Sequence, residues 1–290
     1  VLQFNKKICI FEPLNEVMRF TVSLITFLFS LSLLAGGEDN IVGARSHAIG
    51  QISILHQDLW NAENNPAGLG FQKQFGGGFS YESPFMLNEL AYKAAVFAYP
   101  TSMGAFGLSV GQFGYSQYSE NKIGISYGQR LSKTFALGVQ LNYLSTQIAE
   151  GGYGSNSALS GTIGLMANIS DEFSLAAVVV NPNRAKRSSF QDERYPTLLK
   201  LGLAYNFSEK VKLLSEVVKD IDFDANAKVG IEYHAIESLY LRVGYASNPA
   251  LSTFGFGLLF KDFQLDFASG FHSTLGFTPQ ISLSFSPTKD

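Results

Sequence analysis

The stretch KTFALGVQLNYLSTQ, residues 133–147, alternates between two kinds of side chain. One set of positions carries large apolar side chains: Phe135, Leu137, Val139, Leu141 and Tyr143. The positions between them carry small or polar side chains: Thr134, Ala136, Gly138, Gln140 and Asn142. Because successive side chains of a β-strand point to opposite faces of the sheet, this period of two predicts a strand with one apolar face.

The same alternation recurs along most of the chain. Near the C-terminus, for example, the apolar side chains of Phe254, Phe256 and Leu258 alternate with Gly255 and Gly257. Marking every run of this kind predicts fourteen strands, at residues 75–82, 91–99, 103–111, 121–130, 134–147, 158–169, 172–181, 197–207, 211–219, 225–234, 238–247, 252–260, 263–271 and 279–286. The sequence therefore predicts an all-β fold with an even number of strands.

The connections between these predicted strands alternate in length. Those after even-numbered strands are the short turns PTS, LSK, SD, SEK, AIE and KD, and those after odd-numbered strands are longer, up to NPNRAKRSSFQDERYP around residues 182–196. Bacterial outer-membrane barrels have an even strand number, short periplasmic turns and longer outer loops, with apolar side chains toward lipid. A closed barrel also pairs every backbone group, as hydrocarbon requires. We therefore predict a 14-stranded antiparallel transmembrane β-barrel in the bacterial outer membrane, with both termini in the periplasm.

The composition of the 290-residue chain agrees with β structure. It contains 28 Gly, 25 Phe and 13 Tyr, whereas only 16% of its residues are charged. Glycine and aromatic enrichment with few charges favours strands over helices. The formal net charge is −3, and the one basic run, NRAKRSSF at residues 183–190, is short. No nucleic-acid partner is expected, because no extended basic face is encoded.

The N-terminal region has the layout of a secretory signal peptide. From Met18 the sequence MRFTVSLITFLFSLSLLAGG places one arginine before an apolar run, which ends in the small residues 35–37. That run is shorter than the roughly 20 residues of a spanning helix. We expect residues 1–37 to be a mis-assigned start followed by a signal peptide that begins at Met18. The only cysteine, Cys9, lies in this part, so disulfides and thiol chemistry are excluded from the mature chain.

The segment between the signal peptide and the first strand is predicted to plug the lumen. It contains GARSHAIGQISILHQDLWNAENNPAGLGF, residues 43–71, in which Ile49, Ile52, Leu55 and Leu59 have the spacing of a short amphipathic helix. A barrel of about fourteen strands encloses a lumen that wall side chains alone do not fill. We predict a helical hatch over residues 38–74 and the barrel over residues 75–290, with a bend at Asn65-Pro66-Ala67 that leads into the first strand. The candidate hatch residues are Gly43, Ala44, Arg45, Ser46, Asp58, Asn65, Pro66, Ala67 and Gly68.

Charged side chains in the second half of the chain fall on the lumen-facing positions of the predicted strands. They are Lys200, Lys212, Glu216, Lys228, Glu232, Arg242 and Asp266. A lysine or arginine near the lipid midplane of a barrel costs about 2–4 kcal/mol, so the inward direction is the permitted one. Their mixed signs predict an ion-pair network, which Arg45, Asp58 or Glu63 of the hatch could join. Such a network either packs the interior or binds a substrate.

No enzyme motif stands out in the sequence. The four histidines, His47, His56, His234 and His272, have neither metal-ligand spacing nor a nucleophile beside them. The least improbable acid–base pair, His234 with Asp266, would join two strands that are not neighbours. FGGGF at residues 75–79 lacks the Gly-Lys-Ser/Thr of a phosphate loop. We therefore predict a non-enzymatic protein without cofactor or metal.

The combination of a signal peptide, a pre-barrel segment with GARSHAIG and NPAGL, and fourteen strands resembles the FadL-like superfamily of outer-membrane proteins. The opening GARS and the ending DFASGFHSTLGFTPQISLSF are most similar to its PorV/PorQ branch. This resemblance implies a hatch inside the barrel. It also implies either an accessory barrel of type IX secretion, with export-machinery or cargo proteins as partners, or a transporter of hydrophobic molecules such as fatty acids. The closer motifs and the compact loops favour the accessory barrel, and membrane lipid would surround either one.

Overall fold

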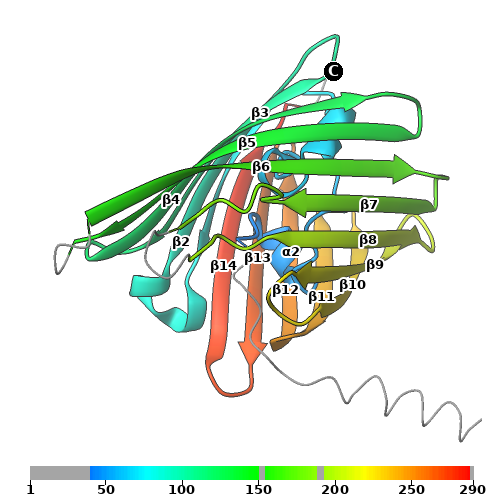
Figure 1. Cartoon of the computed structure of the whole chain (residues 1–290). Helices are drawn as coiled ribbons and strands as arrows, with labels where there is room; N and C mark the ends of the chain where they lie inside the picture. Colours follow the sequence, from blue (N-terminus) through cyan, green and yellow to red (C-terminus); the bar gives the residue numbers. More distant parts are fainter. Residues whose placement is uncertain (1–39, 150–153, 188–192, 288–290) are drawn as a thin grey trace, which may run out of the picture. The chain divides into compact units, whose positions relative to one another are not determined.

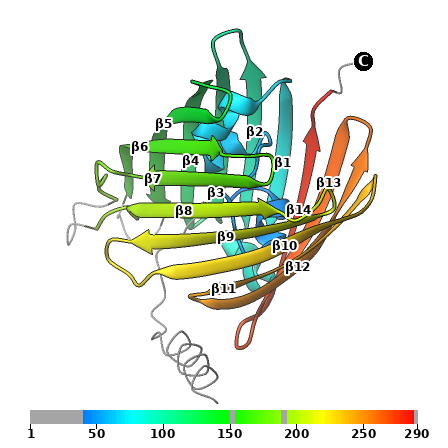
Figure 2. The ribbon, with the colours of Figure 1, turned by 90° about the vertical axis from the view of Figure 1, so that its right-hand side faces the viewer.

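The computed structural model describes residues 40–149, 154–187 and 193–287. Within them, fourteen strands form one closed antiparallel barrel, in which each strand pairs with its neighbours in sequence and β1 pairs with β14 (Figures 1 and 2). The predicted signal peptide and the start at Met18 lie outside the described residues. The all-β, 14-stranded fold predicted from the period of two is confirmed.

The strands have the following bounds: β1 Gly76–Glu82, β2 Tyr92–Pro100, β3 Ala105–Gly114, β4 Tyr118–Arg130, β5 Phe135–Ile148, β6 Gly154–Asn168, β7 Phe173–Val180, β8 Leu198–Asn206, β9 Val211–Asp220, β10 Asn226–Ile236, β11 Leu239–Ser247, β12 Ala250–Phe260, β13 Phe263–His272 and β14 Gly276–Phe285. The helical segments are α2 Ala44–Ala48, α3 Asn61–Asn64, η1 Pro66–Phe71, η2 Pro84–Met86 and η3 Asn88–Leu90. None of the helices in the described ranges is long and apolar enough to cross a membrane.

The two faces of the wall have opposite chemistry. On β5, Val139 and Leu141 are 49% and 59% exposed on the outer face, whereas Gln140 between them is 4% exposed in the lumen. The outer face is therefore a continuous apolar surface, the arrangement that a bilayer requires of a spanning barrel. The barrel is closed by the antiparallel pairing of β1 with β14, in which Gly77 lies opposite Phe285 and Glu82 opposite Gln280.

The lengths of the connections differ from the prediction. The connections after β1 and β7 are long, but the connection between β11 and β12 consists of Asn248 and Pro249 alone. The predicted alternation of short and long connections is therefore wrong at this position. Strands β4, β6 and β14 also begin three or four residues earlier than predicted, and this extension of the sheet shortens the connections before them. Below, the loop end of the barrel is the end with the connections after odd-numbered strands, and the turn end is the other.

Residues 40–74 lie inside the ring of strands, where α2 contacts β11, β12, β13 and β14 and η1 contacts β3, β4, β5 and β6 (Figure 1). The amphipathic helix predicted from the spacing of Ile49, Ile52, Leu55 and Leu59 is wrong, because only the short α2 and α3, on either side of these residues, are helical in this part. The backbone has positive φ at Gly50 and Gln51, 69° and 60°, which ends α2 early. Ile49, Ile52 and Leu55 are fully buried against the surrounding wall, so their spacing reflects burial on several sides rather than one helix face.

Candidate functional site

The described residues 40–74, called the plug below, begin with a tight turn against the wall. Gly43 has φ 96°, and a Cβ there would lie 2.9 Å from the ring of Trp60. The turn starts α2, whose first amide, that of Ala44, donates to Ser282 Oγ of β14 at 3.1 Å. Ala44 and Ser46 are both buried. The GARS sequence therefore anchors the plug to the part of the wall where the barrel closes.

The Asn65-Pro66-Ala67-Gly68 sequence forms the other anchor. Asn65 is extended, with φ −155°, and its side chain accepts from the Ala67 amide at 3.1 Å, which caps η1. Its amide nitrogen donates to the Ile54 carbonyl at 2.8 Å. The prediction that a bend at Asn65-Pro66-Ala67 leads into β1 is wrong. The 3-10 helix η1 begins at this point, continues to Phe71 and packs against the wall before β1 begins. On β5, glycine is required at Gly138, where a Cβ would lie 2.2 Å from the Pro66 carbonyl carbon.

A buried ion-pair cluster joins the plug to β10, β11 and β13. Arg45 pairs with Glu232, with Nη2 2.6 Å from Oε1, and with Asp58, with Nη1 3.3 Å from Oδ2. Arg242 pairs with Glu232 at 2.6 Å and with Asp266 at 2.6 Å. Two arginines thus alternate with three carboxylates, and each charge is opposed by a neighbour of the other sign. Pairing of this kind permits charges to be buried.

A second cluster lies on β9 and β10. Glu216 pairs with Lys228, with Oε1 3.3 Å from Nζ, and its other oxygen accepts from the backbone amides of Ser53 and Ile54 at 2.8 and 3.2 Å. Lys228 Nζ also donates to the Gln51 carbonyl at 2.8 Å. These wall side chains replace the helical hydrogen bonds that the plug backbone does not make here.

A third cluster joins α3 of the plug to the wall, and the sequence predicted only part of it. Lys122 of β4 pairs with Glu63 of α3, and Glu63 Oε2 accepts from Ser109 Oγ at 2.6 Å and Gln140 Nε2 at 3.1 Å. The sequence prediction considered Glu63 but not Lys122. The signal was present, because Ile123 and Ile125 mark the lipid-facing positions of β4 and place Lys122 on the opposite face.

The remaining predicted residues have different surroundings. Lys200 of β8 is 3% exposed in the lumen wall, and Lys212 of β9 lines a cavity at the turn end together with Glu232. His234 does not contact Asp266 as an acid–base partner: its ring stacks on Tyr240, with centroids 4.3 Å apart, while Asp266 is held by Arg242. Among the described residues, no group of three His, Cys, Asp or Glu side chains is placed to hold a metal ion.

The histidine in the middle of the plug is fully enclosed. His56 is 2% exposed, and its Nε2 lies 3.1 Å from the Ile52 carbonyl. Burial lowers the pKa of His56, and the nearby positive charge of Arg45 lowers the same pKa further. The imidazole is therefore neutral at neutral pH, and its Nε2–H donates to the carbonyl.

A vestibule opens above the plug at the loop end, and Asn40 borders each of its three cavities. The largest, about 610 Å³, is lined by residues that include Tyr92, Phe113, Tyr118 and Tyr195. The second has about 300 Å³ and lies between the ends of β1 and β9, and the smallest has about 90 Å³. The vestibule is therefore lined by aromatic rings as well as charged and amide side chains.

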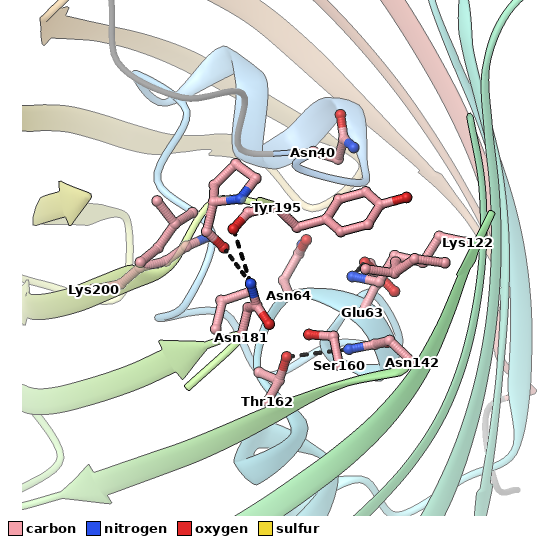
Figure 3. Close-up of a pocket in the computed structure, with 14 residues that line it drawn as sticks. Asn40, Glu63, Asn64, Lys122, Asn142, Ser160, Thr162, Asn181, Tyr195 and Lys200 are labelled. Carbon is pink, nitrogen blue, oxygen red and sulfur yellow. Dashed lines mark hydrogen bonds and ion pairs between the residues drawn. The ribbon is translucent and has the colours of Figure 1, made fainter. Parts of the chain in front are cut away.

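The smallest cavity reaches the plug itself (Figure 3). Asn64 and Glu63 of α3 face it from the plug, and Lys122 and Lys200 face it from the wall (Figure 3). Within the plug, residues such as Ile49, Ile52 and Leu69 are 0% exposed. The vestibule therefore ends at the plug, and no wide aqueous channel follows it through the described residues.

The chain matches no protein-family model, and no curated protein is similar to it in sequence. Solved structures are similar in fold. The toluene transporter TbuX of Ralstonia pickettii has a TM-score of 0.63 and 14% identity, over 85% of this chain and 98% of that chain. The monoaromatic hydrocarbon channel CymD has a TM-score of 0.65 and 14% identity, over 87% and 100%. A FadL homologue of Pseudomonas aeruginosa has a TM-score of 0.61 and 11% identity, over 87% and 99%.

These neighbours are a transporter, a channel and a FadL homologue, and each is covered almost end to end. At 11–14% identity the likeness establishes the architecture and not the ligand. The predicted PorV/PorQ branch and its export partners have no support in these comparisons. The chain thus has the fold of the FadL-type outer-membrane barrels.

Proposed function

We propose that this protein carries hydrophobic small molecules across the outer membrane, with the plug as the gate. The observation that carries the proposal is a closed 14-strand barrel whose own N-terminal segment seals the lumen directly below an aromatic vestibule. The solved neighbours that share this architecture include a toluene transporter and a monoaromatic hydrocarbon channel.

The seal argues against a general pore. In the described lumen the plug fills the cross-section with buried side chains such as Ile52 and Leu69, so ions and water have no wide path. A solute that leaves water for an apolar or aromatic surface can instead collect in the vestibule, which Tyr92, Phe113 and Tyr195 line. Passage then requires the plug to shift. We also propose that the turn end faces the periplasm, as short connections do in such barrels.

The charged clusters have a positioning role in this proposal. Arg45, Asp58, Glu63 and the wall residues that bind them hold the plug in the sealed state. The substrate-binding alternative for this network has less support, because the cluster of Arg45 and Glu232 is occupied by its own ion pairs.

A direct test measures uptake of radiolabelled toluene and of a radiolabelled long-chain fatty acid by bacterial cells with and without the barrel. Ser160 and its neighbour Leu159 offer a matched pair of sites: Ser160 is 3% exposed and lines the smallest cavity, whereas Leu159 is 59% exposed on the outer face. We expect Ser160→Trp to reduce uptake and Leu159→Trp to leave it unchanged, at equal amounts of folded barrel.

Two results would contradict the proposed function or its route through the vestibule. Uptake of both probes equal to that of cells without the barrel is the first. The second is stable co-purification of export-machinery or cargo proteins together with wild-type uptake by Ser160→Trp, which would favour the accessory role implied by the PorV/PorQ resemblance.

A further inference from the structure

The second cavity of the vestibule combines acidic and aromatic side chains. Its volume is about 300 Å³, at the lower end of the range of small-molecule sites. The carboxylates of Asp220 and Asp224 line it from the end of β9 and the connection that follows. The rings of Phe85, Tyr92 and Phe113 line it from β2, β3 and the connection after β1. The two groups come from parts of the wall that β10, β11, β12, β13 and β14 separate.

Two buried side chains of this cavity have polar atoms without a partner. Asp220 is 4% exposed, and its Oδ2 accepts no hydrogen bond from any residue that the structure describes, whereas its Oδ1 accepts from the Asp222 amide at 2.9 Å. Asn248 is 7% exposed, and neither atom of its side-chain amide is bonded within the described ranges. An unsatisfied buried polar group is costly, and a carboxylate oxygen especially so, which makes Asp220 Oδ2 and the Asn248 amide oxygen ready acceptors for a ligand.

The positive charge beside this cavity is already engaged. Lys228 Nζ donates to the Gln51 carbonyl at 2.8 Å and pairs with Glu216 at 3.3 Å. The His47 ring lies 3.6 Å from Glu82, the third carboxylate of the lining. Asp220 and Asp224 therefore leave the cavity with an excess of negative charge.

We propose that this cavity binds an organic cation with a protonated amine. The ammonium group donates to Asp220 Oδ2 and to the Asn248 carbonyl oxygen, and the body of the molecule packs on the aromatic rings, which also attract a cation. The ring-lined wall and the absence of a three-residue metal group among the described residues favour an organic ion over a metal ion. The inference concerns binding and goes beyond the proposed uptake, so it holds whether or not neutral hydrocarbons are carried.

The test is calorimetric titration of the full purified protein in detergent with benzylamine, benzyl alcohol, benzoate and calcium chloride. The three organic probes share one ring and differ in charge. We expect saturable binding of benzylamine, with benzyl alcohol and benzoate at least about tenfold weaker, because an ionic hydrogen bond is lost. Asp220→Asn keeps the oxygen that accepts from the Asp222 amide and should weaken benzylamine binding about tenfold.

The matched control is Asp222→Asn, since Asp222 is an exposed carboxylate of the same connection that does not line this cavity. It should bind benzylamine like the wild type. Asn248→Asp adds a carboxylate and should tighten binding, which keeps the test decisive if Asp220→Asn fails to fold. Benzylamine affinity that Asp220→Asn leaves unchanged in a folded barrel would overturn the proposal. So would equal affinity for benzyl alcohol, binding of calcium alone, or no saturable binding of benzylamine.

Discussion

The guanidinium of Arg45 in the plug holds both carboxylate oxygens of Glu232 on β10, with Nη2–Oε1 2.6 Å and Nε–Oε2 2.9 Å. This two-pronged ion pair connects residues 187 positions apart in the sequence. The same carboxylate also accepts from Arg242 at 2.6 Å, so one wall residue couples the plug to the neighbouring strand.

Replacement of this arginine should loosen the plug. Arg45→Gln removes the charge that opposes Glu232 and Asp58, and we expect a loss of about 1–3 kcal/mol, since Glu232 keeps Arg242 as a partner. The measurement is urea unfolding in lipid vesicles together with hydrogen exchange of residues 44–48. Arg130→Gln is the control for residues 44–48, because the exposed Arg130 donates to turn carbonyls and lies over the ring of Phe71, and β4 makes none of the α2 contacts described above. Equal protection of residues 44–48 from hydrogen exchange in Arg45→Gln and wild type would show that Arg45 does not hold the plug against the wall.

The pair of Glu216 and Lys228 should show energetic coupling. Glu216→Gln leaves the buried Lys228 ammonium without its carboxylate, and Lys228→Met leaves the Glu216 carboxylate with only its backbone donors. The losses of unfolding free energy in the two single variants should add up to more than the loss in the double variant. A double-mutant cycle on unfolding free energies should give a coupling of about 1–3 kcal/mol. Additive effects would show that the two residues stabilise the plug independently.

The wall glycine beneath η1 should not tolerate a side chain. In Gly138→Ala the new Cβ would lie 2.2 Å from the Pro66 carbonyl carbon, so η1 has to move. We expect destabilisation of about 1–3 kcal/mol and faster proteolysis within residues 61–74. Gly161→Ala is the control, because a Cβ at Gly161 has no atom within 4 Å. Wild-type proteolysis of Gly138→Ala would mean that η1 is not clamped by the wall.

The outer face should reject charge. Leu141→Arg places a guanidinium at an outward position in the middle of β5 that is 59% exposed, and we expect a cost of about 2–4 kcal/mol in lipid vesicles. Leu141→Phe, which keeps an apolar side chain, should remain close to wild type. The readout is refolding into vesicles, followed by the gel-mobility difference between boiled and unboiled samples. If Leu141→Arg refolds as stably as Leu141→Phe, this face does not contact hydrocarbon.

The strand pattern could be predicted because it is local. The alternation of Leu137, Val139 and Leu141 with small or polar residues follows from the geometry of one strand, so it needs no knowledge of the partner strand. The same phase placed Glu232, Arg242 and Asp266 in the lumen. The alternation fixes the face of the sheet on which a side chain lies, but not its position along the barrel axis or its partner. The pairing of Glu232 with Arg45 could therefore not be predicted from it. The two-residue connection Asn248-Pro249 also lay beyond it, because the ends of strands depend on how far the sheet pairing extends.

The sequence by itself determined the β fold, the strand number and the lumen-facing charges, since each rests on the period of a single strand. Only the tertiary structure decided the path of the plug, because Ile49, Ile52 and Leu55 are buried by wall on several sides, and the neighbouring amides of Gly50 and Ser53 donate to Thr253 and Glu216. It also decided the vestibule, where Asp220 and Asn248 meet the rings of β2 and β3 only after the barrel closes. Contacts between distant strands follow from closure and register, which no local pattern encodes.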